Sequence, residues 1–130
     1  MRLRILSDLH HEPFGAERPI PSADADVVVL AGDIHTQRNG LAWAARRFPD
    51  TPLVYVAGNH EYYHAHLQQL EAQLRMDARR LGIHFLEKDA VIIDGVRFLG
   101  TTLWTDFDLY GPQGAVAAAN MASQVMPDFR

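Results

Sequence analysis

The chain has 130 residues, 48% of them hydrophobic, which is enough for a single domain over residues 1–130 with its own core. It has no cysteine, which excludes disulfide frameworks, thiolate zinc sites and cysteine nucleophiles and is typical of a reducing compartment. The formal net charge of −4, without a stripe of basic residues, argues against broad nucleic-acid binding, but it is compatible with a phosphorylated substrate held through cations.

The first part of the chain contains two predicted strands separated by a long loop. Residues 3–7 form the first strand, and because no apolar signal region precedes it, we expect a cytoplasmic protein. Prolines and glycines interrupt residues 11–26, so we expect a loop there. The run 27–31 is apolar without alternation, which is typical of a strand buried on both faces of a parallel sheet. No apolar run is long enough to cross a bilayer, which excludes membrane insertion.

Two predicted helices and a third strand follow. Apolar residues recur at helical spacing over residues 37–48, and Pro49 then ends the helix. Residues 53–57 form the third strand. A longer helix is predicted over 60–81, ending at Gly82. This alternation of strands and helices predicts an α/β fold built on a parallel sheet.

The last third of the chain changes to antiparallel pairing. A short strand is predicted at 83–86, and residues 91–99 have the pattern of a hairpin on an Asp94-Gly95 turn. An alanine-rich helix is predicted over 114–126. Four aromatic residues of these elements are expected in the core, namely Trp43, Tyr55, Phe85 and Phe98.

Three polar clusters each follow a predicted strand. They are Asp8-Leu9-His10, Gly32-Asp33-Ile34-His35 and Gly58-Asn59-His60-Glu61. Because the carboxyl ends of parallel strands lie at one edge of a sheet, these clusters should converge. In an extended strand, Asp8 and His10 would point the same way and chelate a divalent cation. Gly32 permits close backbone approach, so Asp33 can reach the same centre. Asn59 offers a neutral amide oxygen.

These ligand types favour hydrolysis of a phosphoester. His60 is placed beside Asn59, where it can protonate a leaving group or stabilise developing charge. Two cations about 3.5–4 Å apart can hold a hydroxide that attacks phosphorus. The sequence therefore indicates a metal-dependent phosphoesterase whose substrate is a phosphorylated small molecule or another phosphoester.

In this order, Asp-x-His, Gly-Asp and Gly-Asn-His-Glu resemble the first three motifs of the calcineurin-like metallophosphoesterases, over residues 1 to about 108. The resemblance implies a metallophosphatase-like β-sandwich flanked by helices (αββα) and two divalent cations, such as manganese, iron or zinc. It implies that Asp8 and His10 bind the first cation and that Asp33 bridges both. Asn59 would then bind the second cation, and catalytic His60 would face a phosphate mono- or diester.

The chain lacks the later histidines of that family, including a Gly-His-x-His pair, because no histidine follows His84. By the family's scheme, the first cation keeps three ligands, whereas the second keeps only Asp33 and Asn59 and should be held weakly. We therefore expect a fold that is incomplete at its C-terminal end and a fragment with impaired catalysis.

Two other functions fit parts of the sequence. His60-Glu61-Tyr62-Tyr63-His64 also matches the His-Glu-x-x-His pattern of zinc peptidases, with Glu87 as a candidate third ligand. The other alternative is a non-catalytic metal-binding or interaction module, in which a homodimer would cover an exposed sheet face.

The remaining histidines and acidic residues have simpler interpretations. Three histidines are expected to be solvated, namely His64, His66 and His84. Asp94 belongs to the hairpin turn, and Asp106 is expected to cap a strand exit. His11 and His35 flank the clusters and stay open as groups that orient ligands or phosphate.

Overall fold

The computed structural model describes residues 1–12 and 19–129. Residues 13–18 of the expected loop lie outside this part, and residues 19–26 contain no helix or strand. Four parallel strands form one sheet in the order β1-β2-β3-β4. They are β1 (Leu3–Leu6), β2 (Val27–Ala31), β3 (Leu53–Val56) and β4 (His84–Phe85). The predicted α/β fold is confirmed, although the strand expected at 83–86 is reduced to two residues.

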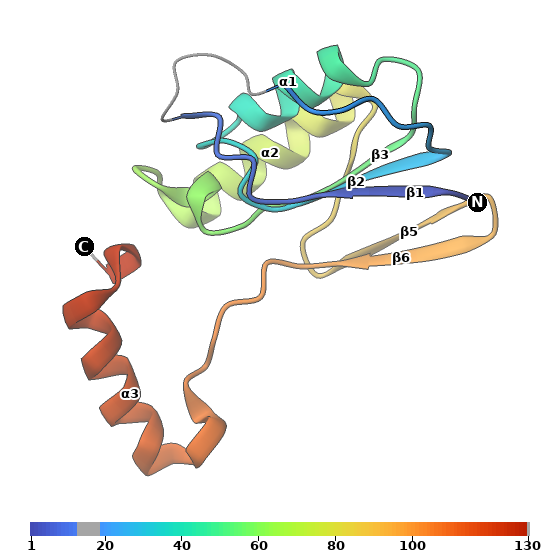
Figure 1. Ribbon diagram of the computed structural model, residues 1–130. Coiled ribbons are helices and arrows are strands. Elements are labelled where there is room, and N and C mark those ends of the chain that lie inside the picture. The colour runs from blue at the N-terminus through green and yellow to red at the C-terminus, as the bar shows by residue number, and fades with distance from the viewer. Residues whose placement is uncertain (13–18, 130) are drawn as a thin grey trace.

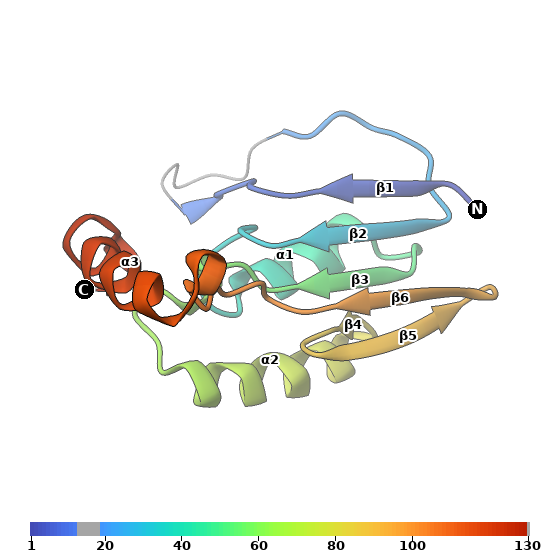
Figure 2. The ribbon, with the colours of Figure 1, turned by 90° about the horizontal axis from the view of Figure 1, so that it is seen from below.

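The elements form three layers. Helices α1 (Asn39–Arg47) and α2 (Leu67–Leu81) cover one face of the parallel sheet. The antiparallel hairpin of β5 (Asp89–Ile93) and β6 (Val96–Gly100) lies on the opposite face (Figure 1). Seen from below, this hairpin lies over the β3 side of the sheet and leaves β1 uncovered (Figure 2). The hairpin face of the parallel sheet is therefore covered only in part.

The main core lies between the sheet and the two helices. Its fully buried members include Leu30 of β2, Leu41 of α1, Tyr55 of β3 and Leu74 of α2. A smaller cluster beneath the hairpin contains Val27, Val54 and Leu86. Three of the four expected core aromatics are buried, namely Trp43, Tyr55 and Phe85. Phe98 packs on the smaller cluster and is only partly buried.

Turn chemistry confirms two predicted boundaries. Asp94 and Gly95 have φ of 48° and 79°, the left-handed pair that a two-residue hairpin turn requires. Gly82 ends α2 with φ of 71°, where a glycine avoids the steric penalty of a side chain.

The helix predicted over 60–81 is wrong in its first part. His60–Tyr62 form an isolated 3₁₀ turn, η2, and α2 begins only at Leu67. The reason is that the Glu61 side chain points into the protein and bonds to backbone at the ends of β2 and β3. The chain must then become extended at Tyr63 and His66 before it can enter α2.

The C-terminal helix α3 (Pro112–Val125) confirms the helix predicted over 114–126. It is flanked by 3₁₀ turns η3 (Asp108–Tyr110) and η4 (Pro127–Phe129) and lies apart from both sheets (Figure 1). No helix in the described part of the chain is long and apolar enough to span a membrane.

Candidate metal centre

The ligand-bearing loops after β1 and β2 adopt left-handed backbone conformations. Asp8, His10 and Asp33 have φ of 53°, 46° and 55°, so the extended geometry predicted for Asp8 and His10 is wrong. The two loops hold each other, because the Asp8 N–H donates to the Gly32 carbonyl at 3.1 Å and the His10 N–H donates to the Asp33 carbonyl at 3.0 Å. Such conformations cost roughly 1–2 kcal/mol per residue and cluster at functional sites.

The same loops bring the predicted ligands together. One ligand atom from each of Asp8, His10 and Asp33 lies within 4.8 Å of the other two, and His10 Nε2 is 3.8 Å from Asp8 Oδ1. Two carboxylates and an imidazole are a donor set that suits zinc, manganese or iron. The Asp8 side chain is 69% exposed, so the centre opens to solvent.

Glycine makes this convergence possible. Gly32 has φ of 89°, and a Cβ atom there would lie 3.0 Å from the N and Cα atoms of Gly58. The close backbone approach predicted for Gly32 is therefore present. Asp33 is fixed on the other side by the His60 N–H, which donates to Oδ1 at 3.0 Å.

The Glu61 side chain links the loops that follow β2 and β3, a role that the sequence did not reveal. Its side chain is fully buried. One oxygen accepts from the backbone N–H groups of Asp33 and Gly58 at 3.0 and 2.8 Å. The other accepts from the Ile34 N–H and the Tyr55 hydroxyl at 3.0 and 2.8 Å. Burial and the neighbouring Glu61 raise the pKa of Tyr55 well above its ordinary value, so the phenol keeps the proton that it donates.

A second polar group lies beside the first. Glu12 Oε1 is 2.7 Å from His60 Nδ1 and 3.4 Å from His10 Nδ1, and the two imidazole rings are 4.3 Å apart. Glu12 lies in the loop after β1, where no periodicity or turn pattern marks it.

Comparison with known proteins agrees with this geometry. The sequence profile of the calcineurin-like phosphoesterases matches residues 1–112. The chain belongs to this family. Its fold is similar to the crystal structure of phosphopantetheinyl hydrolase from Mycobacterium tuberculosis, with a TM-score of 0.69 and 20% identity. That similarity covers 95% of this chain and 50% of the hydrolase, so the chain spans half of its length. No curated protein matches the sequence.

Asn59 follows β3 and is half-buried. Its amide nitrogen donates to the Tyr63 hydroxyl at 3.2 Å and to Asp128 Oδ1 at 2.8 Å. Both bonds use the nitrogen, so Oδ1 is the atom suited to bind a cation. Asp128 lies in η4, which places the C-terminal turn next to the site.

The residues of the zinc-peptidase pattern do not come together as a site in the described part of the chain. Glu61 is buried and bonded to backbone groups, whereas His64 is exposed. Glu87 accepts hydrogen bonds from the Thr101 hydroxyl at 2.9 Å and the Thr102 N–H at 2.8 Å. The proposed base and third ligand are therefore both engaged in structural hydrogen bonds.

Other polar residues have local partners. His11 is buried against the Trp43 ring, 4.7 Å between centroids, and His35 Nδ1 contacts the Thr36 hydroxyl at 3.2 Å. His66 and His84 are exposed, as expected. Asp106 does not lie at a strand exit, because β6 ends at Gly100, but its Oδ1 accepts from the Asp108 N–H at 2.9 Å, so its role is local and structural.

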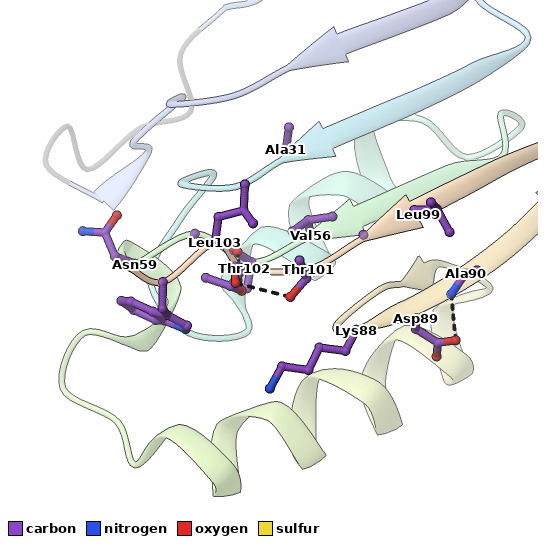
Figure 3. Close-up of a pocket in the computed structure, with 14 residues that line it drawn as sticks. Ala31, Val56, Asn59, Lys88, Asp89, Ala90, Leu99, Thr101, Thr102 and Leu103 are labelled. Atoms are coloured by element: carbon purple, nitrogen blue, oxygen red, sulfur yellow. Dashed lines mark hydrogen bonds between the residues drawn. The ribbon is translucent and has the colours of Figure 1, made fainter. Parts of the chain in front are cut away.

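A hollow of about 930 Å³ is lined by residues of β2, β3 and β6 and reaches Asn59 (Figure 3). Apolar side chains of Ala31, Val56, Leu99 and Leu103 line it, and Asn59 stands at one end. The chain thus has an apolar surface that reaches Asn59, one of the candidate ligands.

Proposed function

We propose that this chain is the part of a metal-dependent phosphoesterase that binds the catalytic cations and hydrolyses phosphate mono- or diesters. The observation that carries the proposal is the convergence of Asp8, His10 and Asp33 ligand atoms within 4.8 Å, in a chain whose family is known. Bound divalent cations would activate water and neutralise the charge of the phosphate.

In this proposal the three polar clusters supply different ligands to the cations. Asp8 and His10 would hold the first cation, and Asp33 would be shared with the second. The Asn59 amide oxygen then holds the second cation without adding negative charge. With only Asp33 and Asn59 as ligands from this chain, that cation must complete its coordination with water and is held more weakly.

In the same proposal, His60 protonates the leaving group. Its backbone N–H is bonded to Asp33, so the residue is held beside the carboxylate proposed to bridge the cations, and its ring lies 4.3 Å from the His10 ring. From there it can give a proton to the departing oxygen.

The substrate we propose is a phosphorylated small molecule whose organic part occupies the hollow beside Asn59. The apolar walls of Val56, Leu99 and Leu103 support this assignment, because apolar surfaces with few polar groups are typical of small-molecule sites.

Hydrolysis of p-nitrophenyl phosphate and of bis(p-nitrophenyl) phosphate with added Mn²⁺ or Zn²⁺ tests the proposal. We expect turnover that requires the cation, rises with its concentration and is lost in Asp33→Asn, which keeps the side-chain shape but removes the charge. The ratio of the two rates distinguishes a monoesterase from a diesterase. Asp106→Asn is the matched control, because that residue only caps a turn. Equal rates with and without chelator would contradict the proposal.

A second candidate is a non-catalytic metal-binding module that pairs with a second copy of the chain. It is favoured by the exposed apolar surface of Ile5, Leu99 and Leu103, which are 65%, 78% and 91% exposed. Sedimentation equilibrium of the wild type and of Leu99→Lys tests it. A dimer that the substitution dissociates, in a protein that binds a cation without turnover, would favour this candidate.

A further inference from the structure

Glu12 lies between the two histidines of the site. Its Oε1 atom is 2.7 Å from His60 Nδ1 and 3.4 Å from His10 Nδ1. Both contacts use the same ring position, Nδ1. An ionised carboxylate can only accept hydrogen bonds, so each Nδ1 atom that bonds to Glu12 must carry the hydrogen.

We propose that Glu12 is a positioning residue that selects the Nδ1–H tautomer of both His10 and His60. In a neutral imidazole with hydrogen on Nδ1, the lone pair lies on Nε2. One carboxylate would thus determine which nitrogen each histidine presents on the side away from Glu12. The choice of tautomer does not depend on the proposed function. Only the roles of the two Nε2 atoms, cation binding at His10 and proton transfer at His60, rest on it.

The geometry at His10 fits this assignment. Its Nε2 lies 3.8 Å from Asp8 Oδ1, so the ring directs Nε2 toward Asp8 and Nδ1 toward Glu12. A metal-binding histidine commonly donates its other N–H group to a carboxylate, which fixes both the tautomer and the ring orientation. With the lone pair on Nε2, His10 and Asp8 can bind the same cation.

The geometry at His60 follows the same logic. Since Nδ1 is bonded to Glu12, Nε2 is turned away from the carboxylate. Its lone pair can take up a proton, and the imidazolium so formed can give that proton to the leaving group. The His60 ring also packs 4.4 Å from the Tyr63 ring. The ring is thereby held by a hydrogen bond at Nδ1 and by an aromatic contact, which leaves Nε2 as the reactive nitrogen.

Glu12 has few other interactions in the described part of the chain. Its side chain is 19% exposed, and its second oxygen, Oε2, is buried without a hydrogen-bond partner among the described residues. The carboxylate is therefore suited to serve the two histidines rather than a structural network.

Direct binding of a cation by Glu12 is the competing explanation, since ligand atoms of His10, Glu12 and His60 also lie within 4.8 Å of one another. Two tetrahedral ligands of one zinc ion, each about 2.0–2.1 Å from it, lie about 3.4 Å apart. The 2.7 Å separation of His60 Nδ1 and Glu12 Oε1 is instead a hydrogen-bond length. Coordination through Nδ1 would also leave Nε2 protonated, which the test can detect.

The test is a long-range proton–nitrogen correlation spectrum of the full chain with ¹⁵N-labelled histidine, recorded at a pH where the rings are neutral. We expect His10 and His60 to have hydrogen on Nδ1 in the wild type. Glu12→Ala should abolish this preference at both rings, whereas Glu12→Gln, which retains an acceptor oxygen, should preserve it at His60. The exposed His66 and His84 are internal controls and should not change.

Calorimetric titration with Zn²⁺ adds a second readout. Loss of a carboxylate that orients a metal-binding histidine typically lowers metal affinity by about 10–100-fold, so we expect that loss in Glu12→Ala and a smaller one in Glu12→Gln.

Hydrogen on Nε2 of His60 in the wild type would overturn the proposal, and so would tautomers that are unchanged in a folded Glu12→Ala. Zinc bound to either Nδ1 would favour direct ligation and likewise overturn it. If Glu12→Ala does not fold, the wild-type and Glu12→Gln spectra still decide. A chain that has the expected tautomers but binds no cation and hydrolyses nothing would refute only the proposed function.

Discussion

A Cβ atom at Gly58 would lie 2.1 Å from Oδ1 of Asp33 and 2.8 Å from the Asp33 backbone nitrogen. Real Cβ atoms do not approach other atoms this closely, so any side chain at position 58 must displace Asp33. The residue that begins the third polar cluster thus makes room for the carboxylate of the second. This packing explains why both clusters contain a glycine just before their ligand.

Replacing Gly58 by alanine is therefore expected to displace the Asp33 carboxylate without replacing any candidate ligand. In the wild type, Mn²⁺ or Zn²⁺ should raise the midpoint of thermal unfolding, and Gly58→Ala should show no such rise. Gly95→Ala is the matched control. Its φ is +79° and no atom lies near the new Cβ, so it should lower stability by roughly 1–2 kcal/mol but keep the metal-induced rise. An undiminished rise in Gly58→Ala would contradict the packing argument.

Glu61 is expected to be the most sensitive polar residue for stability. A glutamine there keeps one acceptor oxygen and points an N–H₂ group at backbone donors, so Glu61→Gln should cost about 3 kcal/mol of unfolding free energy. Tyr55→Phe removes one of its hydrogen bonds and should cost about 1–2 kcal/mol. Urea denaturation measures both.

The control for this prediction is Glu71→Gln, in an i,i+4 ion pair with Arg75 on α2. It should change stability by about 0.5 kcal/mol or less. If Glu61→Gln were as stable as this control, Glu61 would not hold the loops together.

The features that could be predicted from the sequence are determined by residues close together in the chain. The apolar run of β2, the Asp94-Gly95 turn and the glycine after α2 depend on near neighbours in sequence, and all three predictions are confirmed. The convergence of Asp8, His10 and Asp33 followed from parallel strand order, which is also a consequence of the local pattern.

The features that were missed depend on distant contacts. Glu61 is a residue type usually found at the surface, and it is buried because its acceptors meet donors at Asp33 and Ile34, 28 and 27 residues earlier. The left-handed conformation of Asp8 depends on the carbonyl of Gly32 in the next loop. Glu12 is found only once the third cluster brings His60 against it.

Cation binding is expected to stabilise the protein through Asp33. At a cation concentration one hundred times Kd, the expected gain in unfolding free energy is about 2.7 kcal/mol, and Asp33→Ala should abolish it. Asp24→Ala should retain the full gain, because that carboxylate is 90% exposed and its ion pair is with Arg2, away from the candidate ligands. Thermal unfolding with and without Zn²⁺ measures all three proteins. A gain in Asp33→Ala equal to that of the wild type would place the cation elsewhere.

Glu87 is expected to make the stability of the fold depend on pH. It is buried just before β5 and accepts hydrogen bonds from the hydroxyl of Thr101 and the backbone N–H of Thr102. Burial acts to raise the pKa of Glu87, but these hydrogen bonds outweigh it, so the pKa lies below the ordinary value of 4.5. The hydroxyl of Thr102 in turn donates to the Ala57 carbonyl at 2.7 Å, which connects the segment after β6 to the end of β3.

The sign of the effect follows from the lowered pKa. Unfolded Glu87 binds its proton more tightly than the folded carboxylate does, so the stabilisation is complete above pH 4.5 and is lost as the pH falls through the folded pKa. The unfolding free energy of the wild type should therefore exceed that of Glu87→Gln most at neutral pH, and this difference should shrink below about pH 4.5.

Thr101→Val, which removes one of the stabilising hydrogen bonds, should show a smaller change with pH. Urea denaturation from neutral pH to about pH 3 measures the difference, and a difference that stays constant over this range would show that the hydrogen bonds to Glu87 do not depend on its charge.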